Sequence, residues 1–464
     1  MGEQTIAAIS TALGSSGIGI VRISGERAVE VADRVFRSPS GKRLADCPSH
    51  TIHYGYIYDG DQMIDEVLAM LMRGPHSFTT EDTVEFDCHG GVYVVKRVLD
   101  AVLRNGAVPA EPGEFTKRAF LGGRIDLSQA EAVMELIQSQ NEYALEASVR
   151  QLKGNLSEKI RDLRADILHQ LAFIEAALDD PEHYELDGYE GEILSFSVRM
   201  EEELSALIRS FENGRQMIEG IKTVIVGKPN AGKSSILNLL AGEERAIVTD
   251  VAGTTRDVLE ENIVLDGMNL RLLDTAGIHD TEDPVESIGV SRAWSHVKDA
   301  DLILYVADSF SGIDENDRHI LRELDKEKTL VLINKTDIEQ IGEKEINRIY
   351  GEIQNVLGEF TPIPFSAKEK TGMEELKKSI SDMFFAGRIS FNDQIYITNA
   401  RHKRLLDEAR ESIRLVKAGA ESGVSEDLYS IDLMDAYEKL GLILGDEVED
   451  DLVDEIFRSF CMGK

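Results

Sequence analysis

Residues 223–240 read TVIVGKPNAGKSSILNLL, which predicts a buried strand, a phosphate-binding loop and a helix in direct succession. The glycines of this GxxxxGKS pattern allow main-chain N–H groups to turn toward a phosphate, and the helix N-terminus adds a favourable field. Lys233 is expected to neutralise phosphate oxygens, and Ser234 to bind Mg2+. The other contacts expected from this loop are Asn230, Ala231, Gly232 and Ser235.

A DTAG motif follows a second predicted strand. Asp274 stands at the strand end and is suited to hold Mg2+ through water. Gly277 can approach a γ-phosphate closely because it has no side chain. With Thr275 and Ala276 between them, these residues form the expected second half of a nucleoside triphosphate site.

The base at this site is expected to be guanine. Residues 330–337 read LVLINKTD, a strand that ends in Asn334, Lys335 and Asp337. The Asp337 carboxylate can accept from guanine N1 and N2 together, whereas adenine offers no such pair of donors. Charge-assisted hydrogen bonds contribute about 1.5–3 kcal/mol each, so this motif selects GTP over ATP by orders of magnitude. Another strand precedes a loop that fits a contact to the base and consists of Ser366, Ala367 and Lys368.

The catalytic glutamine of Ras-like proteins has no counterpart here. Ile278 stands just after the DTAG motif, and its aliphatic side chain cannot orient the attacking water. No arginine finger is evident in the sequence, and such a group is worth about 10³–10⁵ in rate. The sequence therefore predicts either a slow switch or another group that replaces them.

The composition limits the partners and the compartment. The chain has 464 residues, enough for two or three domains, and carries 50 basic against 85 acidic side chains, a net charge of −35. Such acidity repels nucleic acid, so an RNA-directed role requires a local basic patch or a basic partner. Three distant cysteines, no signal peptide and no apolar run of about 18 residues favour a reducing cytoplasm and no membrane span.

The periodicity divides the chain into four segments. Residues 1–122 mix β-rich runs with Gly and Pro turns, which predicts a compact α+β domain. Residues 217–383 alternate strands with helices, which predicts a parallel sheet. Because 123–216 and 384–464 are both helical, we expect the α/β module to be inserted into one helical domain.

Apolar stripes predict individual helices in the helical segments. One long helix is expected to bury Leu145, Val149, Leu152, Leu156, Ile160, Leu163, Ile167, Leu171 and Ile174. A second runs towards Gly214 and turns inward Ile193, Leu204, Leu207 and Phe211. After the α/β module, helical spacing returns at Leu405, Ile413 and Val416. A terminal helix is expected to pack and to present Cys461 through Leu452, Val453, Ile456, Phe457 and Phe460.

Three further stretches carry a family resemblance. Residues 249–257 read TDVAGTTRD, residues 17–25 read GIGIVRISG, and residues 460–464 read FCMGK. With Asn230, they resemble the tRNA modification GTPase MnmE (TrmE) family over the whole chain. The resemblance implies a multidomain α/β plus α protein with an N-terminal α+β tetrahydrofolate-binding-like and dimerisation domain, a discontinuous helical domain and an inserted Ras-like P-loop GTPase domain.

The resemblance also implies a substitute for the missing catalytic groups. A potassium ion would lie against the phosphates, held by Asn230, Thr249, Val251 and Thr254. Thr255 would join Ser234 as a Mg2+ ligand. The contacts of this loop with GTP would come from Thr249, Asp250, Val251, Ala252, Gly253, Thr254 and Thr255. Glu286 matches the acid that positions the attacking water through a bridging water, whereas the residues alone favour a solvated acid.

In the N-terminal domain the resemblance implies a tetrahydrofolate derivative, in its 5,10-methylene or 5-formyl form. Its contacts, carried over by position, would be Arg22, Glu85, Arg124 and Lys464. Family members often have Lys at the place of Arg124, and a planar fork does not reproduce the contacts of a point charge. Cys461 would be catalytic, with its role as acid, nucleophile or structural element left open. His89 is interpreted as structural or as lining the folate pocket.

The function implied by the resemblance is that of a potassium-activated GTPase in tRNA modification. It would help to add a carboxymethylaminomethyl group to C5 of the wobble uridine of certain tRNAs. It would act as a homodimer and form a heterotetramer with the flavin-dependent MnmG (GidA) partner in the cytoplasm. The nucleotide motifs fit an RNA-binding ribosome-assembly or stress-regulatory GTPase equally well, although such proteins usually carry a basic appendage. A folate-dependent one-carbon enzyme with an inserted regulatory GTPase is the third alternative.

Overall fold

The fold was analysed in a computed structural model of the 464-residue chain. The residues it describes are 4–180, 188–243, 261–273, 294, 296–338, 341–385, 395–446, 448, 450–458, 460 and 463. The chain divides into two compact units. The first unit comprises Met1–Ile137, Arg150–Glu201 and Leu405–Lys464, and the second comprises Gln138–Val149 and Glu202–Arg404.

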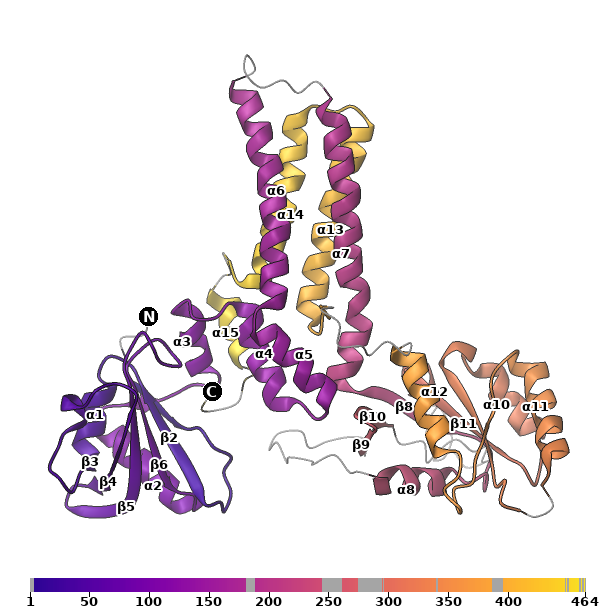
Figure 1. The fold of residues 1–464 in the computed structure, drawn as a ribbon, viewed down its shortest axis with the longest axis horizontal. Helices are drawn as coiled ribbons and strands as arrows, with labels where there is room; N and C mark the ends of the chain where they lie inside the picture. The colour runs from indigo at the N-terminus through magenta and orange to yellow at the C-terminus, as the bar shows by residue number, and fades with distance from the viewer. Residues whose placement is uncertain are drawn as a thin grey trace, which may run out of the picture. The chain divides into compact units, whose positions relative to one another are not determined.

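The N-terminal part of the first unit is the expected α+β domain. Its seven-stranded sheet has the order β3 (Phe36–Arg37), β4 (Thr51–Asp59), β5 (Gln62–Met72), β6 (Thr83–His89), β2 (Ile18–Ser24), β1 (Ile6–Ile9) and β7 (Val108–Pro109). Neighbouring strands are antiparallel except for β1 and β7. Helices α1 (Ala28–Val35) and α2 (Val92–Arg104) cover one face, where their Val and Ala side chains share a core with Ile23 and Phe86 (Figure 1).

The other face of this sheet is covered only in part. Phe115 of α3 (Glu114–Leu121) packs on Ile6 and Ala8 of β1. On β4 and β5, Ile52, Tyr54 and Leu68 are 60%, 45% and 43% exposed. Because side chains alternate along a strand, these three lie on one face, opposite the helices.

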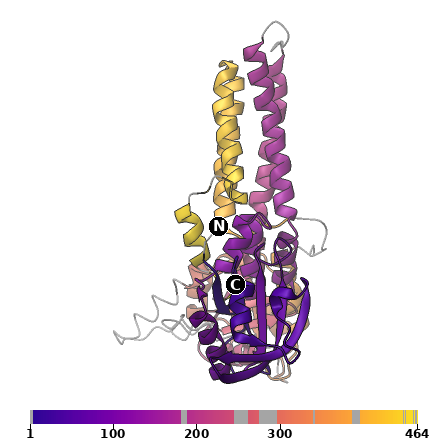
Figure 2. The same cartoon turned by 90° about the vertical axis from the view of Figure 1, so that its left-hand side faces the viewer.

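A helix bundle in the first unit joins segments far apart in the sequence. It consists of α6 (Asn155–Asp179), α14 (Glu426–Leu444), the part of α7 (Tyr189–Glu219) up to Glu201 and the part of α13 (Ala400–Glu421) from Leu405, which lie side by side in Figures 1 and 2. Arg414 of α13 pairs with Glu201 of α7 at 2.7 Å. The discontinuous helical domain is therefore confirmed. No helix within the described ranges has the length and apolar character needed to cross a membrane.

The prediction of one long first helix is wrong. The predicted stripe from Leu145 to Ile174 spans two helices, α5 (Glu142–Leu152) and α6, which are preceded by α4 (Leu127–Gln138), and the break before α6 lies at Gly154. Gly154 has a φ of 94°, a left-handed conformation that ends an α-helix and that favours glycine. The second helix, α7, continues past Gly214 to Glu219. A Cβ on Gly214 would lie 2.2 Å from the Ile397 carbonyl oxygen, so this glycine permits a close approach rather than a helix end.

The second unit contains the expected Ras-like α/β domain, called here the G domain. Its six-stranded sheet has the order β13 (Ile363–Pro364), β12 (Thr329–Asn334), β11 (Leu302–Asp308), β8 (Ile221–Val226), β10 (Met268–Leu272) and β9 (Glu261–Leu265). Only β9 is antiparallel to its neighbour. One face packs against α8 (Lys233–Glu243) and α12 (Met373–Phe385), the other against α10 (Glu315–Glu323) and α11 (Glu343–Leu357). The motif loops therefore follow the carboxyl ends of parallel strands, where α/β sheets bind ligands.

Candidate functional site

The phosphate loop connects β8 to α8 and encloses its own lysine. Lys233 donates from Nζ to the carbonyl oxygens of Gly227, at 2.6 Å, and Lys228, at 2.9 Å. Gly227 has a φ of 149°, and a Cβ there would lie 2.3 Å from the Val306 carbonyl oxygen. Burial lowers the pKa of Lys233, because the loop removes the ammonium from water. The loop therefore holds a partly desolvated cation on main-chain acceptors, which an anionic phosphate can engage.

The buried Asn334 amide connects this loop with two others. Its Nδ2 donates to the Ala231 carbonyl oxygen at 2.8 Å, and its Oδ1 accepts from the Ala367 N–H at 3.2 Å. A Cβ on Gly232 would lie 2.1 Å from Asn334 Nδ2, so the loop needs glycine at this position. Asn334, the first residue of the NKTD motif, thus fixes the phosphate loop against the loop of Ser366, Ala367 and Lys368, called here the SAK loop.

A cavity of about 460 Å³ opens beside Asn334. Its lining residues are Gly232, Ser235, Asn334, Lys335, Asp337, Ile338, Ala367 and Lys368. Asp337 Oδ1 accepts from Ser366 Oγ at 2.6 Å. This hydrogen bond, together with the charge of Lys368, lowers the pKa of Asp337. The carboxylate at the cavity therefore stays ionised, as an acceptor for guanine N1 and N2 requires.

The sequence did not predict two ion pairs between lysine and aspartate in this region. Lys335 Nζ lies 2.8 Å from Asp308 Oδ2, at the end of β11, and Lys228 Nζ lies 3.1 Å from Asp317 Oδ2. The signal for Asp308 was available, because 302–308 read LILYVAD, a buried strand that ends in an acid beside β12. Nothing in the local pattern identified Asp317 as a partner of the phosphate loop.

Other predicted residues of the nucleotide site lie outside the described ranges. They are Thr249, Asp250, Val251, Ala252, Gly253, Thr254, Thr255, Asp274, Thr275, Ala276, Gly277 and Glu286. Of the residues expected to bind Mg2+ and K+, the structure therefore describes only Ser234 and Asn230. Ser234 is in the first turn of α8, and Asn230 has a φ of 61° within the phosphate loop.

A second cluster lies in the N-terminal domain and includes three of the four predicted folate contacts. Arg22 Nε donates to Glu85 Oε1 at 2.6 Å. The Phe78 ring lies 5.0 Å from the Arg22 guanidinium and 4.6 Å from that of Arg124, and Phe115 lies 5.4 Å from Arg22. Arg22 Nη1 is buried and has no hydrogen-bond partner within the described part of the chain. This orphan donor and the two guanidinium groups fit an anionic ligand such as a folate.

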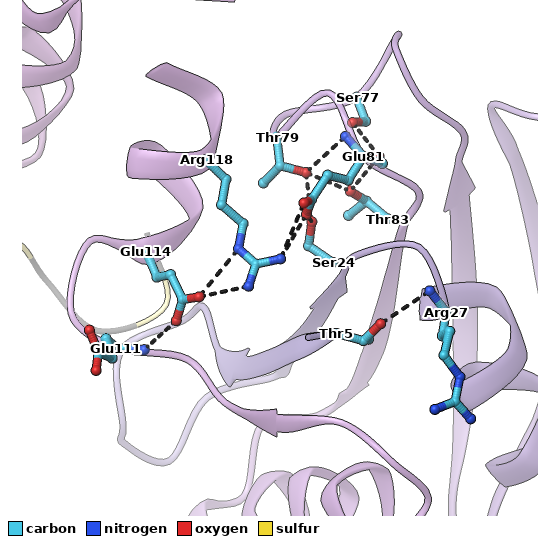
Figure 3. A network of polar contacts seen from close by, with 10 residues as sticks. All are labelled: Thr5, Ser24, Arg27, Ser77, Thr79, Glu81, Thr83, Glu111, Glu114 and Arg118. Atoms are coloured by element: carbon cyan, nitrogen blue, oxygen red, sulfur yellow. Dashed lines mark hydrogen bonds and ion pairs between the residues drawn. The ribbon is translucent and has the colours of Figure 1, made fainter. Parts of the chain in front are cut away.

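A buried polar network fixes the loop that carries Phe78 (Figure 3). Arg118 Nη1 donates to both carboxylate oxygens of Glu81, at 3.0 and 3.2 Å. Ser24 Oγ donates to Glu81 Oε2 at 2.9 Å and shares a 2.6 Å hydrogen bond with Thr79. Because Thr79 follows Phe78 directly, the network fixes the backbone beside the aromatic ring.

The C-terminal helix α15 (Asp450–Arg458) packs as expected, with one exception. Val453, Phe457 and the following Phe460 are buried against the N-terminal segments. Leu452 is 41% exposed, so its place in the predicted stripe is wrong. One turn of helix has only one inward position between Val453 and Phe457, and the partly buried Ile456 occupies it.

Phe460 and Gly463, near the C-terminus, contact the N-terminal domain. A Cβ on Gly113 would lie 2.8 Å from Phe460 Cβ, and Ser10 Oγ donates to the Gly463 carbonyl oxygen at 2.9 Å. Ser10 follows β1, whose Ala8 pairs with Arg22 of the aromatic cluster. Cys461 and Lys464 themselves lie outside the described ranges.

His89 lies at the surface, which argues against the predicted role as a residue that lines a pocket. Its side chain is 70% exposed, and Nδ1 lies 2.7 Å from Asp65 Oδ1. This hydrogen bond and the Asp65 charge raise the pKa of His89. The contact favours the structural interpretation, because it connects the end of β6 with β5.

Comparisons with known proteins match nearly the whole chain. The family model for the MnmE helical domain matches residues 127–461, and that for the GTP-binding protein TrmE N-terminus matches residues 5–124. The tRNA modification GTPase MnmE of Lachnoclostridium phytofermentans is 52% identical over 465 residues, covering 100% of both chains. The protein of the same name from Geobacillus kaustophilus is 47% identical over 464 residues, covering 99% of each.

Replacing Asp337 tests the assignment of the base cavity. Asp337→Asn is expected to weaken GTP binding by about 10²-fold or more, because a carboxamide cannot accept from guanine N1 and N2 together. The same variant should gain affinity for xanthosine triphosphate, since its N–H can donate to the xanthine C2 oxygen. Calorimetry measures both, with the exposed Asp299→Asn as control. Unchanged GTP affinity in Asp337→Asn would remove Asp337 from the base contacts.

Proposed function

The chain belongs to the MnmE family of tRNA modification GTPases, and we propose that its GTP hydrolysis drives addition of a carboxymethylaminomethyl group to C5 of the wobble uridine of certain tRNAs. The observation that carries this proposal is the aromatic cluster around Arg22, with an orphan donor suited to folate, in a chain that also has a guanine-nucleotide cavity.

In the proposed nucleotide site, GTP binds on the phosphate loop, the DTAG loop and the two base loops. Mg2+ is held by Ser234 and Thr255, and the hydroxyl oxygens of both suit this hard cation. K+ is held by Asn230, Thr249, Val251 and Thr254, and supplies the positive charge that an arginine finger provides elsewhere. Glu286 positions the attacking water, the task that Ile278 cannot perform.

In the proposed folate site, Arg22, Glu85, Arg124 and Lys464 bind a tetrahydrofolate derivative that supplies one carbon when bound. Support comes from the orphan Nη1 of Arg22 and from the two guanidinium groups on Phe78. Cys461 acts on the substrate beside this site. The described residues on either side of it, Phe460 and Gly463, contact the N-terminal domain, which is consistent with that location.

The proposed assembly is a homodimer that joins the flavin-dependent MnmG partner in a heterotetramer, and it acts on tRNA in the cytoplasm. The partly uncovered sheet face with Ile52, Tyr54 and Leu68 supports a dimer through the N-terminal domain, because contiguous exposed apolar side chains mark protein contacts. The net charge of −35 supports a division of labour in which the basic partner holds the tRNA.

Nucleoside analysis tests the modification. In a host strain that lacks this protein, C5-modified wobble uridine is expected to disappear from tRNA and to return with the wild-type gene. Arg22→Ala and Cys461→Ser should each fail to restore it, whereas Arg27→Ala, at an exposed surface ion pair, should succeed. Mass spectrometry of digested tRNA measures the nucleoside. Unchanged nucleosides with accumulating ribosomal precursors would favour the assembly-GTPase alternative instead.

Exchanging K+ for Na+ tests the proposed catalytic role of potassium. GTP turnover of the full chain is expected to be about tenfold or more faster in K+ than in Na+ at equal ionic strength, because K+ replaces the missing arginine finger. Asn230→Ala should abolish this difference. Phosphate release measures the rates, and equal wild-type rates in the two salts contradict the potassium assignment.

A charged substitution on the uncovered sheet face tests the proposed dimer. Leu68→Asp places a charge among apolar side chains and is expected to convert a dimer into a monomer at micromolar concentration. Leu428→Asp, at a similarly exposed position on α14, is the control that should leave the mass unchanged. Sedimentation equilibrium measures both, and a dimeric Leu68→Asp chain would place the interface elsewhere.

A further inference from the structure

A buried ion pair, outside the nucleotide contacts, joins the phosphate loop to α10. Lys228 is 7% exposed and Asp317 is fully buried, and their charged atoms lie 3.1 Å apart. Lys228 Nζ also donates to the Gly312 carbonyl oxygen at 2.5 Å. Burying two charges is costly unless hydrogen bonds satisfy the remaining atoms. The pair therefore requires an explanation beyond chance packing.

Both carboxylate oxygens of Asp317 accept hydrogen bonds from the elements beside the phosphate loop, β11 and the start of α10. Its Oδ1 accepts from the Tyr305 hydroxyl at 2.8 Å, and its Oδ2 accepts from the Asp314 N–H at 3.1 Å. Tyr305 lies on β11 and is the register partner of Val226, the last residue before the loop. Asp314 caps α10 through the N–H groups of its first turn. Asp317 is thus a fixed anchor, because both of its oxygens are bonded to sheet and helix.

The anchor acts on Lys233 through the main chain of Lys228. The side chain of Lys228 bonds to Asp317, while its carbonyl oxygen, together with that of Gly227, accepts from Lys233. We propose that the Lys228–Asp317 ion pair is a positioning device that sets these carbonyl oxygens and so directs the Lys233 ammonium to the β-phosphate of the nucleotide. The inference rests on the proposed nucleotide site.

The charge of Lys228 has a second consequence for Lys233. The Asp317 carboxylate attracts the Lys233 ammonium and opposes the lowering of the Lys233 pKa by burial. Lys228 compensates that carboxylate, since it is the cation in direct contact with it. Without Lys228, the unpaired Asp317 competes with phosphate for Lys233. The pair therefore keeps Lys233 free to bind an anion.

Nucleotide affinities in the full chain test this role, because GDP has a β-phosphate and GMP lacks one. Lys228→Met is expected to weaken GDP binding by about tenfold or more while changing GMP binding by less than about threefold. Asp317→Asn in the Lys228→Met background should recover part of the GDP affinity, because the competing charge is gone. Lys344→Met, an exposed lysine of α11, is the matched control. Calorimetry measures each affinity.

Tyr305→Phe provides a milder variant in case Lys228→Met does not fold. It removes one hydrogen bond from Asp317 and should weaken GDP, but not GMP, by about threefold to tenfold. Equal losses for GDP and GMP, or no loss for GDP, would overturn the positioning role. Lys233→Ala separates the two proposals. If Lys233→Ala leaves the wild-type preference for GDP over GMP intact, the proposed phosphate site itself fails.

Discussion

The G domain depends on one buried carboxamide, that of Asn334. It donates to the phosphate loop and accepts from the SAK loop, so three loops from distant parts of the sequence share one rigid connection. Its distance to Gly232 leaves no space for a Cβ, which explains why the phosphate loop needs glycine there. Burying a polar group without hydrogen-bond partners costs free energy. Because separating the loops would break the two hydrogen bonds of the buried Asn334 amide, the amide holds the phosphate loop and the SAK loop together.

The strand ends and loop motifs of this site could be predicted because their patterns are local. Residues 223–234 specify strand, glycine loop and helix within one window, and NKTD specifies its acid at the end of a buried run. The partners of those motifs could not be predicted the same way. Lys228 meets Asp317 across 89 positions (317 minus 228), and only the packing of α10 beside β11 brings them together.

The errors have the same origin in local patterns. The apolar spacing from Leu145 to Ile174 is continuous, yet Gly154 interrupts it, because a left-handed glycine changes the chain direction without disturbing the spacing of apolar residues. Leu452 has the spacing of a core residue, but α15 is short and packs through a narrow stripe. In the cluster around Arg22, the residues Arg22, Glu85 and Arg124 were named through the family resemblance, whereas Phe78 had no sequence signal.

The acidity of the chain and its two proposed anion-binding sites are compatible because several buried or partly buried cations are paired locally with carboxylates. Lys228, Lys335 and Arg118 each contact a carboxylate, so they contribute rigidity with little net field. Two described cations differ. Lys233 is held by carbonyl oxygens, and burial alone lowers the pKa of Arg124, whose guanidinium lies on Phe78. An anionic ligand gains most where the cation has no bonded carboxylate to displace, and these two residues stand at the two proposed sites.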